Sequence, residues 1–216
     1  MSEHLRVLFL SPEVVPFAKT GGLADMSGSL PGALRRQGAE VRLCLPFYRM
    51  VREGGFETRY VLKNLAVPLC KETLAADILE ARMEEDIPVY LVDREDLYDR
   101  PNLYGNSSGD YYDGLERFTF FANASLLIAE ALGFSPHIIH CHDWQTGLVP
   151  ALLRGTYRQS STLQDAKTVF TIHNIGYQGL FPVDKFRVTG LPIQFFNPEG
   201  LEFWGKISLL KAGIVY

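Results

Sequence analysis

The chain has few cysteines, and their spacing argues against disulfides and metal sites. Its 216 residues include three, Cys44, Cys70 and Cys141, with no Cys-x-x-Cys pair. An odd number without paired spacing is unlike a disulfide framework or a zinc site. Cys44 and Cys141 lie in or beside apolar stretches that are typical of buried strands. We therefore predict reduced core cysteines in a cytoplasmic protein.

The sequence also lacks an excess of positive charge and a long apolar run. Lys and Arg number 21 against 25 Asp and Glu, a net charge of −4. Such a chain does not attract nucleic acid or an anionic membrane through its overall field, so any phosphate must be bound by a local group. No apolar run could span a bilayer, and Met1-Ser2-Glu3-His4 does not begin like a signal peptide. We expect a cytoplasmic protein with neither nucleic acid nor membrane as partner.

Several common catalytic signatures are absent. The glycine pair Gly21-Gly22 fits neither the P-loop nor the spaced glycines of dinucleotide-binding proteins, and no acidic ribose-binding residue follows the second expected strand. This argues against a nicotinamide-dependent oxidoreductase. No Gly-x-Ser-x-Gly elbow is present, which argues against a serine hydrolase triad.

What is present is an alternation of buried strands and helices that predicts an α/β fold, a Rossmann-like, doubly wound and mostly parallel sheet. Pro31 within the first helical pattern predicts a kink there, or a helix that begins near Ser29. Two partly alternating segments, with a turn at 71–73, predict a hairpin that forms an antiparallel excursion from the main sheet. We expect main strands at 5–10, 41–45, 89–92, 138–141 and 169–172, hairpin strands at 59–69 and 74–83, and helices at 23–37, 115–132 and 144–157.

The segment Lys19-Thr20-Gly21-Gly22-Leu23-Ala24-Asp25 joins the first strand to the first helix. Adjacent glycines at such a junction let backbone N–H groups approach an anion, and ligands of open α/β sheets bind at the carboxyl ends of strands. The alternative is a tight turn with a surface lysine. Asp25 either accepts hydrogen bonds from a sugar or caps the helix.

Two further polar groups follow expected strands. His140, His142, Asp143 and Trp144 end one strand, and His173-Asn174 end the next. A right-handed crossover would bring these two groups to the same rim of the sheet. Each residue also has a plainer interpretation. The histidines could be structural or bind a metal, although no third ligand is near in sequence; Asp143 could cap a helix, and Trp144 could be core.

The segment from Leu97 to Asp113 is rich in Tyr, Gly, Asn and Asp, and we expect a long surface loop. Its aromatic rings, interspersed with amides and carboxylates, suit a carbohydrate ligand but equally a protein interface. The tyrosines concerned are Tyr98, Tyr104, Tyr111 and Tyr112, with Tyr177 further along the chain.

Taken together, these motifs resemble one enzyme family. The glycine segment, Leu43-Cys44-Leu45-Pro46-Phe47-Tyr48, the segment from His140 to Leu148 and the segment from Thr171 to Gly179 are similar to bacterial glycogen synthase and plant starch synthase. The resemblance runs from about Arg6 to Tyr216, in the same order and spacing. Each motif alone is weakly specific, and the combination is highly specific.

The resemblance implies a GT-B glycosyltransferase, in which two Rossmann-like domains face each other across a cleft. It implies transfer of glucose from ADP-glucose to the non-reducing end of an α-1,4-glucan, with retention at the anomeric carbon, and it implies no metal and no other cofactor. By similarity, Lys19, Gly21 and Gly22 would contact the phosphates or the donor sugar. The residues expected to line the glucose and acceptor side are Asp25, Asp143, Trp144, His173 and Asn174, with Tyr104 as an acceptor-side aromatic. Of these, the resemblance implies that Asp25, Asp143 and His173 are catalytic and that the others bind substrate.

Members of this family are about twice as long as the present chain. We therefore expect residues 1–216 to form the N-terminal, acceptor-side domain, without the C-terminal nucleotide-binding domain that would be its partner. Such a domain would not transfer glucose alone. The alternative is a carbohydrate-binding or regulatory module that kept the fold but has no catalysis of its own.

Overall fold

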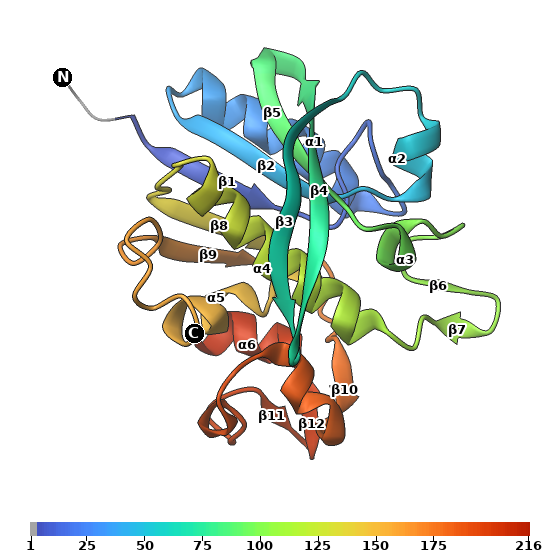
Figure 1. The fold of residues 1–216 in the computed structure, drawn as a ribbon, viewed down its shortest axis with the longest axis vertical. Helices are drawn as coiled ribbons and strands as arrows, with labels where there is room; N and C mark the ends of the chain where they lie inside the picture. Colours follow the sequence, from blue (N-terminus) through green and yellow to red (C-terminus); the bar gives the residue numbers. More distant parts are fainter. Residues whose placement is uncertain (1–3) are drawn as a thin grey trace.

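The computed structural model describes residues 4–216, built around one seven-stranded sheet (Figure 1). Residues 1–3, which belong to the segment read as unlike a signal peptide, lie outside the described part. The sheet has the order β3-β4-β5-β2-β1-β8-β9. Its parallel strands are β1 (Arg6–Leu10), β2 (Glu40–Pro46), β5 (Ile87–Asp93), β8 (Ile138–His142) and β9 (Lys167–Thr171).

The strand order explains why the strands read as apolar runs without alternation. From β1 the chain passes through helix α1 (Gly22–Arg36) to β2 on one side, and it later returns to add β8 and β9 on the other side of β1. Right-handed crossovers in opposite directions put helices on both faces of a sheet, which buries both faces of its central strands. Residues Leu8, Phe9 and Leu10 of β1 are fully buried. The predicted doubly wound α/β fold is confirmed.

Helix α1 runs without a break through Pro31, so the predicted start near Ser29 is wrong. A proline inside a helix removes one backbone donor. Here the flanking turns are anchored by packing, because Ala24 and Ser27 before the proline are completely buried. The helix ends at Arg36, and Gly38 with φ +90° reverses the chain toward β2.

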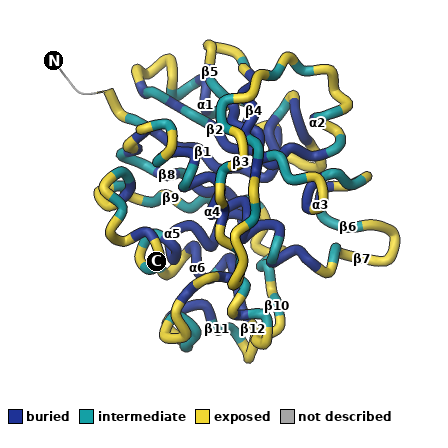
Figure 2. The backbone as a smooth tube through the Cα atoms, viewed as in Figure 1, coloured by how far each residue is buried: buried dark blue, intermediate teal, exposed yellow. Residues whose placement is uncertain are grey.

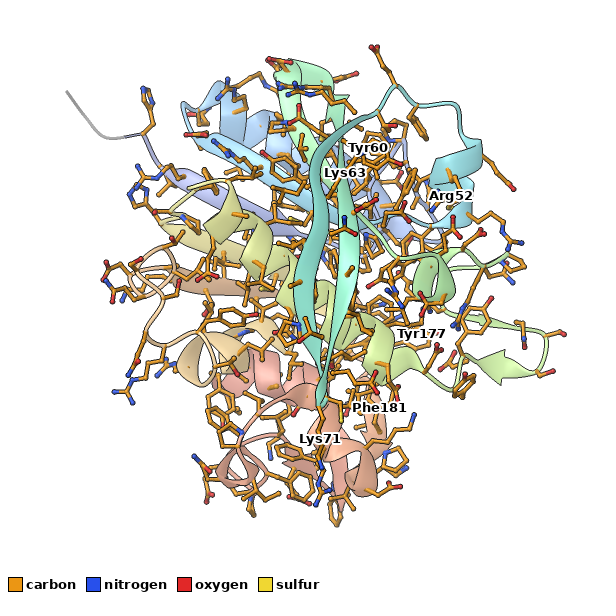
Figure 3. The ribbon with its side chains drawn as sticks, in the orientation of Figure 1. Arg52, Tyr60, Lys63, Lys71, Tyr177 and Phe181 are labelled. Atoms are coloured by element: carbon orange, nitrogen blue, oxygen red, sulfur yellow. The ribbon has the colours of Figure 1, made fainter. Side chains whose placement is uncertain are left out.

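The hairpin of β3 (Arg59–Leu69) and β4 (Glu72–Met83) is confirmed, but its turn lies at residues 70–71 and not at the predicted 71–73, because residues 72 and 73 already pair with β3. The hairpin stays part of the main sheet, because β4 pairs antiparallel with β5 along its length. Strand β3 is therefore an edge, and most of it is exposed or half-buried (Figure 2). Charged side chains protect such an edge from pairing with other chains. On β3, the Nζ atom of Lys63 lies over the Tyr60 ring, 4.6 Å from its centre (Figure 3).

Helix α4 (Gly114–Ala131) crosses the middle of the molecule and is buried on nearly all sides (Figures 1 and 2). The predicted helix at 115–132 is confirmed. The helix packs against β2, β3 and β5, and other parts of its surface contact α5 (Val149–Arg154) and the segments that follow β8 and β9. A helix enclosed in this way is mostly apolar, and buried polar side chains such as Asn123 and Ser125 donate to carbonyls one turn earlier in the same helix.

The remaining elements are short. The loop-rich region after β9 forms a small three-stranded sheet in the order β10-β12-β11, at the lower end of the molecule in Figure 1. Cys44 and Cys141 are buried as predicted, and burial raises the pKa of the Cys44 thiol to about 12. The other elements are α2 (Arg49–Glu53), η1 (Glu84–Asp86), α3 (Glu95–Tyr98), β6 (Gly105–Asn106), β7 (Gly109–Asp110), η2 (Trp144–Thr146), β10 (Leu180–Pro182), η3 (Val183–Thr189), η4 (Ile193–Phe195), β11 (Glu202–Phe203), β12 (Lys206–Ser208) and α6 (Leu209–Val215).

Substitution of Phe121, a fully buried residue of α4, tests this packing. Phe121→Ala removes a ring from a site enclosed on all sides, and we expect the free energy of unfolding to fall by about 3–5 kcal/mol. Urea denaturation followed by circular dichroism measures the change. The matched control is Tyr112→Ala, at an 85% exposed position, where a change of more than about 0.5 kcal/mol is not expected. Equal losses in the two variants would contradict the described burial of α4.

Candidate active site

A cavity of about 740 Å³ opens at the carboxyl ends of β1, β8 and β9. It lies between β1 and β8, where the order in which the chain adds strands to the sheet reverses direction. Such a topological switch point is the usual place for a ligand in an open α/β sheet. Its walls come from the glycine segment, the tyrosine-rich loop, and the ends of β8 and β9 with the segment after them. Among the predicted site residues, those that line it are Gly21, Gly22, Tyr104, Asp143, Trp144, His173 and Asn174.

The glycine segment is held by Glu13, a residue that is not among the predicted site residues. Glu13 Oε2 accepts the backbone N–H groups of Thr20 at 2.5 Å and Gly21 at 3.1 Å. Its Oε1 accepts the hydroxyls of Thr20 at 2.6 Å and Tyr104 at 2.7 Å. Glu13 is only 4% exposed. The sequence signal that could have identified Glu13 as a functional residue is a carboxylate among apolar residues, shortly after a buried strand.

This arrangement decides which groups of the glycine segment face the cavity. The Gly21 amide is bound to Glu13, whereas Gly22 is the first residue of α1 and Leu23 the second. The first amides of a helix have no partner one turn earlier, and they carry the positive end of the helix dipole. Gly21 is the N-cap and offers no side chain, so no side-chain oxygen caps this helix.

Lys19 and Asp25 are joined in an ion pair, with Nζ and Oδ1 2.6 Å apart. Both side chains are more than half exposed, at 52% and 57%. Such a pair contributes little to stability and can open readily. Asp25 thus pairs with the charge of Lys19 beside the start of α1, and its side chain does not cap this helix.

Asp143 binds the backbone at the end of the neighbouring strand. Its Oδ1 accepts the N–H of His173 at 2.7 Å and that of Asn174 at 3.4 Å. Asp143 has φ +56°, in the left-handed region that non-glycine residues seldom adopt, and it is 8% exposed. The alternative in which Asp143 caps the following helix is wrong, since it makes no side-chain cap bond. The predicted helix 144–157 is instead divided into η2 and α5.

The predicted meeting of the two strand ends is confirmed. Strands β8 and β9 pair in parallel, and His142 Nδ1 lies 3.1 Å from His173 Nε2. His140 Nε2 bonds to Thr171 Oγ1 at 2.8 Å. Burial lowers the pKa of His140 to about 4 and that of His142 to about 2, so both rings are neutral near pH 7. Across residues 4–216, no group of three or more His, Cys, Asp or Glu side chains could hold a metal ion.

Trp144 is both a packing residue and part of the cavity wall. Its ring lies edge-on to Phe118 at 5.0 Å and tilted against Phe181 at 5.8 Å. Gly179 sits against the indole so closely that an added Cβ would lie 2.4 Å from a ring carbon. Glycine is therefore required there, both for space and for its φ of +58°. The remaining indole surface lines the cavity.

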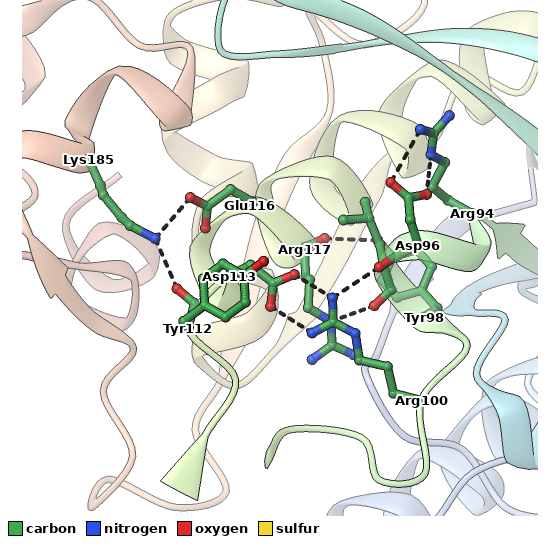
Figure 4. Close-up of polar contacts among 10 residues, drawn as sticks. Arg94, Asp96, Tyr98, Arg100, Tyr112, Asp113, Glu116, Arg117 and Lys185 are labelled. Atoms are coloured by element: carbon green, nitrogen blue, oxygen red, sulfur yellow. Dashed lines mark hydrogen bonds and ion pairs between the residues drawn. The ribbon is translucent and has the colours of Figure 1, made fainter. Parts of the chain in front are cut away.

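The tyrosine-rich segment is more ordered than the predicted surface loop, since it contains α3 and the short pair β6 and β7. Arg100 binds both oxygens of Asp113, at 2.7 and 2.5 Å, and Arg117 Nε donates to the Leu97 carbonyl (Figure 4). The expectation that Tyr98 lies in a surface loop is wrong. Tyr98 is fully buried and donates to the Arg117 carbonyl at 2.8 Å.

The comparisons with known proteins agree with this geometry. A family model described as "Starch synthase catalytic domain" matches residues 6–216. The chain belongs to this family. The predicted resemblance to glycogen and starch synthases is thereby confirmed.

Two relatives illustrate the similarity within the starch synthase catalytic domain family. The glycogen synthase of Syntrophotalea carbinolica is 42% identical over 212 residues, which cover 98% of this chain and 44% of the relative. Glycogen synthase 2 of Geobacter sulfurreducens is 43% identical over 211 residues, covering 98% and 43%. The chain therefore spans less than half the length of these relatives.

A solved structure extends the similarity to the fold. The catalytic domain of starch synthase IV from Arabidopsis thaliana, bound to ADP and acarbose, superposes with a TM-score of 0.88 at 28% identity. The match covers 99% of this chain and 43% of the plant chain.

None of the helices within residues 4–216 is both long and apolar enough to cross a membrane.

Replacement of Glu13 tests its role in holding the glycine segment. Glu13→Ala removes a charged acceptor from two amides and two hydroxyls. Because hydrogen bonds to charged groups contribute about 1.5–3 kcal/mol each at most, we expect a loss of about 2–3 kcal/mol in the free energy of unfolding. Urea titration measures the loss, with the exposed Glu84→Ala as control. No difference between these two variants would contradict the role given to Glu13.

Proposed function

We propose that this chain is the acceptor-side half of an ADP-glucose-dependent α-1,4-glucan glucosyltransferase. The observation that carries the proposal is the single cavity in which the start of α1, the end of β8 and the end of β9 converge. The relatives named glycogen synthase support the reaction, and the plant starch synthase bound to ADP and acarbose supports the ligand classes. The reaction moves glucose from ADP-glucose to the non-reducing end of the glucan, with retention.

The start of α1 is suited to the diphosphate of the donor. Gly22 and Leu23 present helix-terminal amides at the cavity, and a 15-residue helix brings the positive end of its dipole there. Lys19 supplies a full positive charge. Its exposed ion pair with Asp25 lets the ammonium turn to a phosphate while Asp25 becomes free to accept a hydroxyl of the donor sugar.

The ends of β8 and β9 are suited to the transferred glucose. Asp143 fixes the His173–Asn174 backbone through two N–H groups, which orients the side chains of His173 and Asn174 into the cavity wall. Trp144 and Tyr104 offer aromatic surface for the sugar faces of the donor and the acceptor. The His173 carbonyl is the group we assign to the anomeric centre.

Three carboxylates in or near the cavity are already bonded to other groups, which favours a mechanism without a protein nucleophile. Glu13 is engaged by the glycine segment, Asp143 by backbone amides and Asp25 by Lys19. The leaving phosphate can instead take the proton of the incoming hydroxyl on the same face of the sugar, which gives retention. The protein then acts by stabilising charge that develops in the transition state.

The chain alone is expected to have no transferase activity, because it supplies one wall of a cleft and spans less than half of its relatives' length. The test is incorporation of radiolabelled glucose from ADP-glucose into glycogen, by this chain and by the chain joined to the C-terminal part of its protein. We expect incorporation only in the second case. Turnover by the 216-residue chain would contradict this expectation.

Two substitutions in the joined protein distinguish an enzyme from a binding module. Lys19→Ala removes the charge beside the phosphates, and His173→Ala removes a cavity-lining ring. We expect kcat/KM to fall by about 10²-fold or more in each, the scale of losing one group that stabilises a transition state. The control is Lys167→Ala, an exposed lysine at the start of β9. A carbohydrate-binding or regulatory module would show no activity, or activity indifferent to both substitutions.

A further inference from the structure

His142 is a buried ring with one engaged and one free nitrogen. It ends β8, is fully buried, and contacts the rings of Phe9 at 4.2 Å and His140 at 4.1 Å between centroids. Its Nδ1 lies 3.1 Å from His173 Nε2. Its Nε2 is buried and has no hydrogen-bond partner among the residues the structure describes.

Only one proton can lie between His142 and His173. A hydrogen bond between two ring nitrogens needs one protonated and one bare nitrogen, and a neutral imidazole carries a single N–H. Burial together with the neighbouring rings of His140 and His173 strongly lowers the pKa of His142. His142 is therefore neutral, and the position of its proton decides the tautomer of His173.

Two arrangements satisfy the bond, and they differ in what they leave buried. In the first, His142 donates from Nδ1, and a bare nitrogen lone pair at Nε2 is left without a partner. In the second, His173 donates, and His142 must carry its proton at Nε2, which leaves a buried N–H without an acceptor. Orphaned buried N–H groups are rarer in proteins than under-satisfied acceptors. The first arrangement is favoured.

We propose that His142 is a positioning residue that donates its Nδ1–H to His173 Nε2 and so places the ring proton of His173 on Nδ1. His173 lines the cavity and its backbone N–H is held by Asp143, so both the location and the tautomer of the ring are set by its neighbours. Its Nδ1–H is then a fixed donor for an oxygen atom of the bound sugar.

Only the sugar-facing role of this N–H rests on the proposed function. The tautomers are a property of this chain without ligand. Their measurement therefore succeeds or fails independently of the transferase assay.

Two-bond ¹H–¹⁵N correlation spectra of the histidine-labelled chain at pH 7.5 test the proposal. Such spectra distinguish Nδ1–H, Nε2–H and doubly protonated rings from the shifts of the two nitrogens. We expect both His142 and His173 in the Nδ1–H form, with single substitutions assigning the signals. An Nε2–H form of His142 or of His173 would overturn the proposal.

Two variants separate donation from packing. In His142→Asn the side-chain amide occupies the place of Nδ1–H and still donates, so His173 is expected to keep its Nδ1–H form. In His142→Phe the donor is lost while an aromatic ring remains, and Nε2–H is expected to become the major form of His173. An unchanged His173 tautomer in a folded His142→Phe chain would also overturn the proposal. If that variant does not fold, the wild-type spectrum alone decides the matter.

Discussion

The Glu13 carboxylate accepts four hydrogen bonds at the end of β1, three from the glycine segment and one from Tyr104. Asp143 has the same role at the end of β8, where its carboxylate accepts hydrogen bonds from two backbone N–H groups at the start of the segment after β9. Both carboxylates are nearly buried. A buried charge is costly unless it is fully hydrogen-bonded. Here most of the donors are backbone N–H groups of loop segments, which would otherwise lack a hydrogen-bond partner. The walls of the cavity depend on these two residues.

This constraint also shapes the chemistry that the cavity can support. Carboxylates that are committed to backbone amides are poor candidates for nucleophiles, but they hold other groups rigidly. What faces the cavity is then a helix N-terminus, several aromatic rings including Tyr104 and Trp144, and the His173–Asn174 pair, with the exposed Lys19 close by in sequence. These groups favour anionic and polyhydroxylated ligands, and they act by fixed charge and fixed dipoles. The stacked neutral histidines behind His173 extend the same rigidity into the sheet.

The parts that could be predicted from sequence follow from local pattern. Apolar runs such as residues 5–10 identify the parallel strands, and polar residues directly after them identify the rim where ligands bind. The pairing of the His142 and His173 ends followed from the handedness of crossovers. Where the pattern was strongest, sequence and structure agree within one or two residues at the ends of elements.

The parts that could not be predicted depend on partners far apart in the chain. Tyr104 reaches Glu13 across 91 positions, and Asp143 reaches His173 across 30, so neither bond leaves a local signal. The same reason explains the wrong predictions. Asp143 precedes a helix-like stretch as a cap would, and Tyr98 lies in a polar segment as a surface residue would. Tertiary contacts with β9 and with α4 decide both positions.

Amide hydrogen exchange of the chain tests the central claim most directly, because it reads the carboxylate-bound N–H groups one by one. The account predicts that the amides of Thr20, Gly21 and His173 exchange markedly more slowly than that of exposed Ile175. Among these three amides, Glu13→Gln is expected to weaken protection at Thr20 and Gly21 only, and Asp143→Asn at His173 only. Exchange of these three amides at the rate of an unbonded loop in the unmodified chain would contradict the claim that buried carboxylates hold the walls of the cavity.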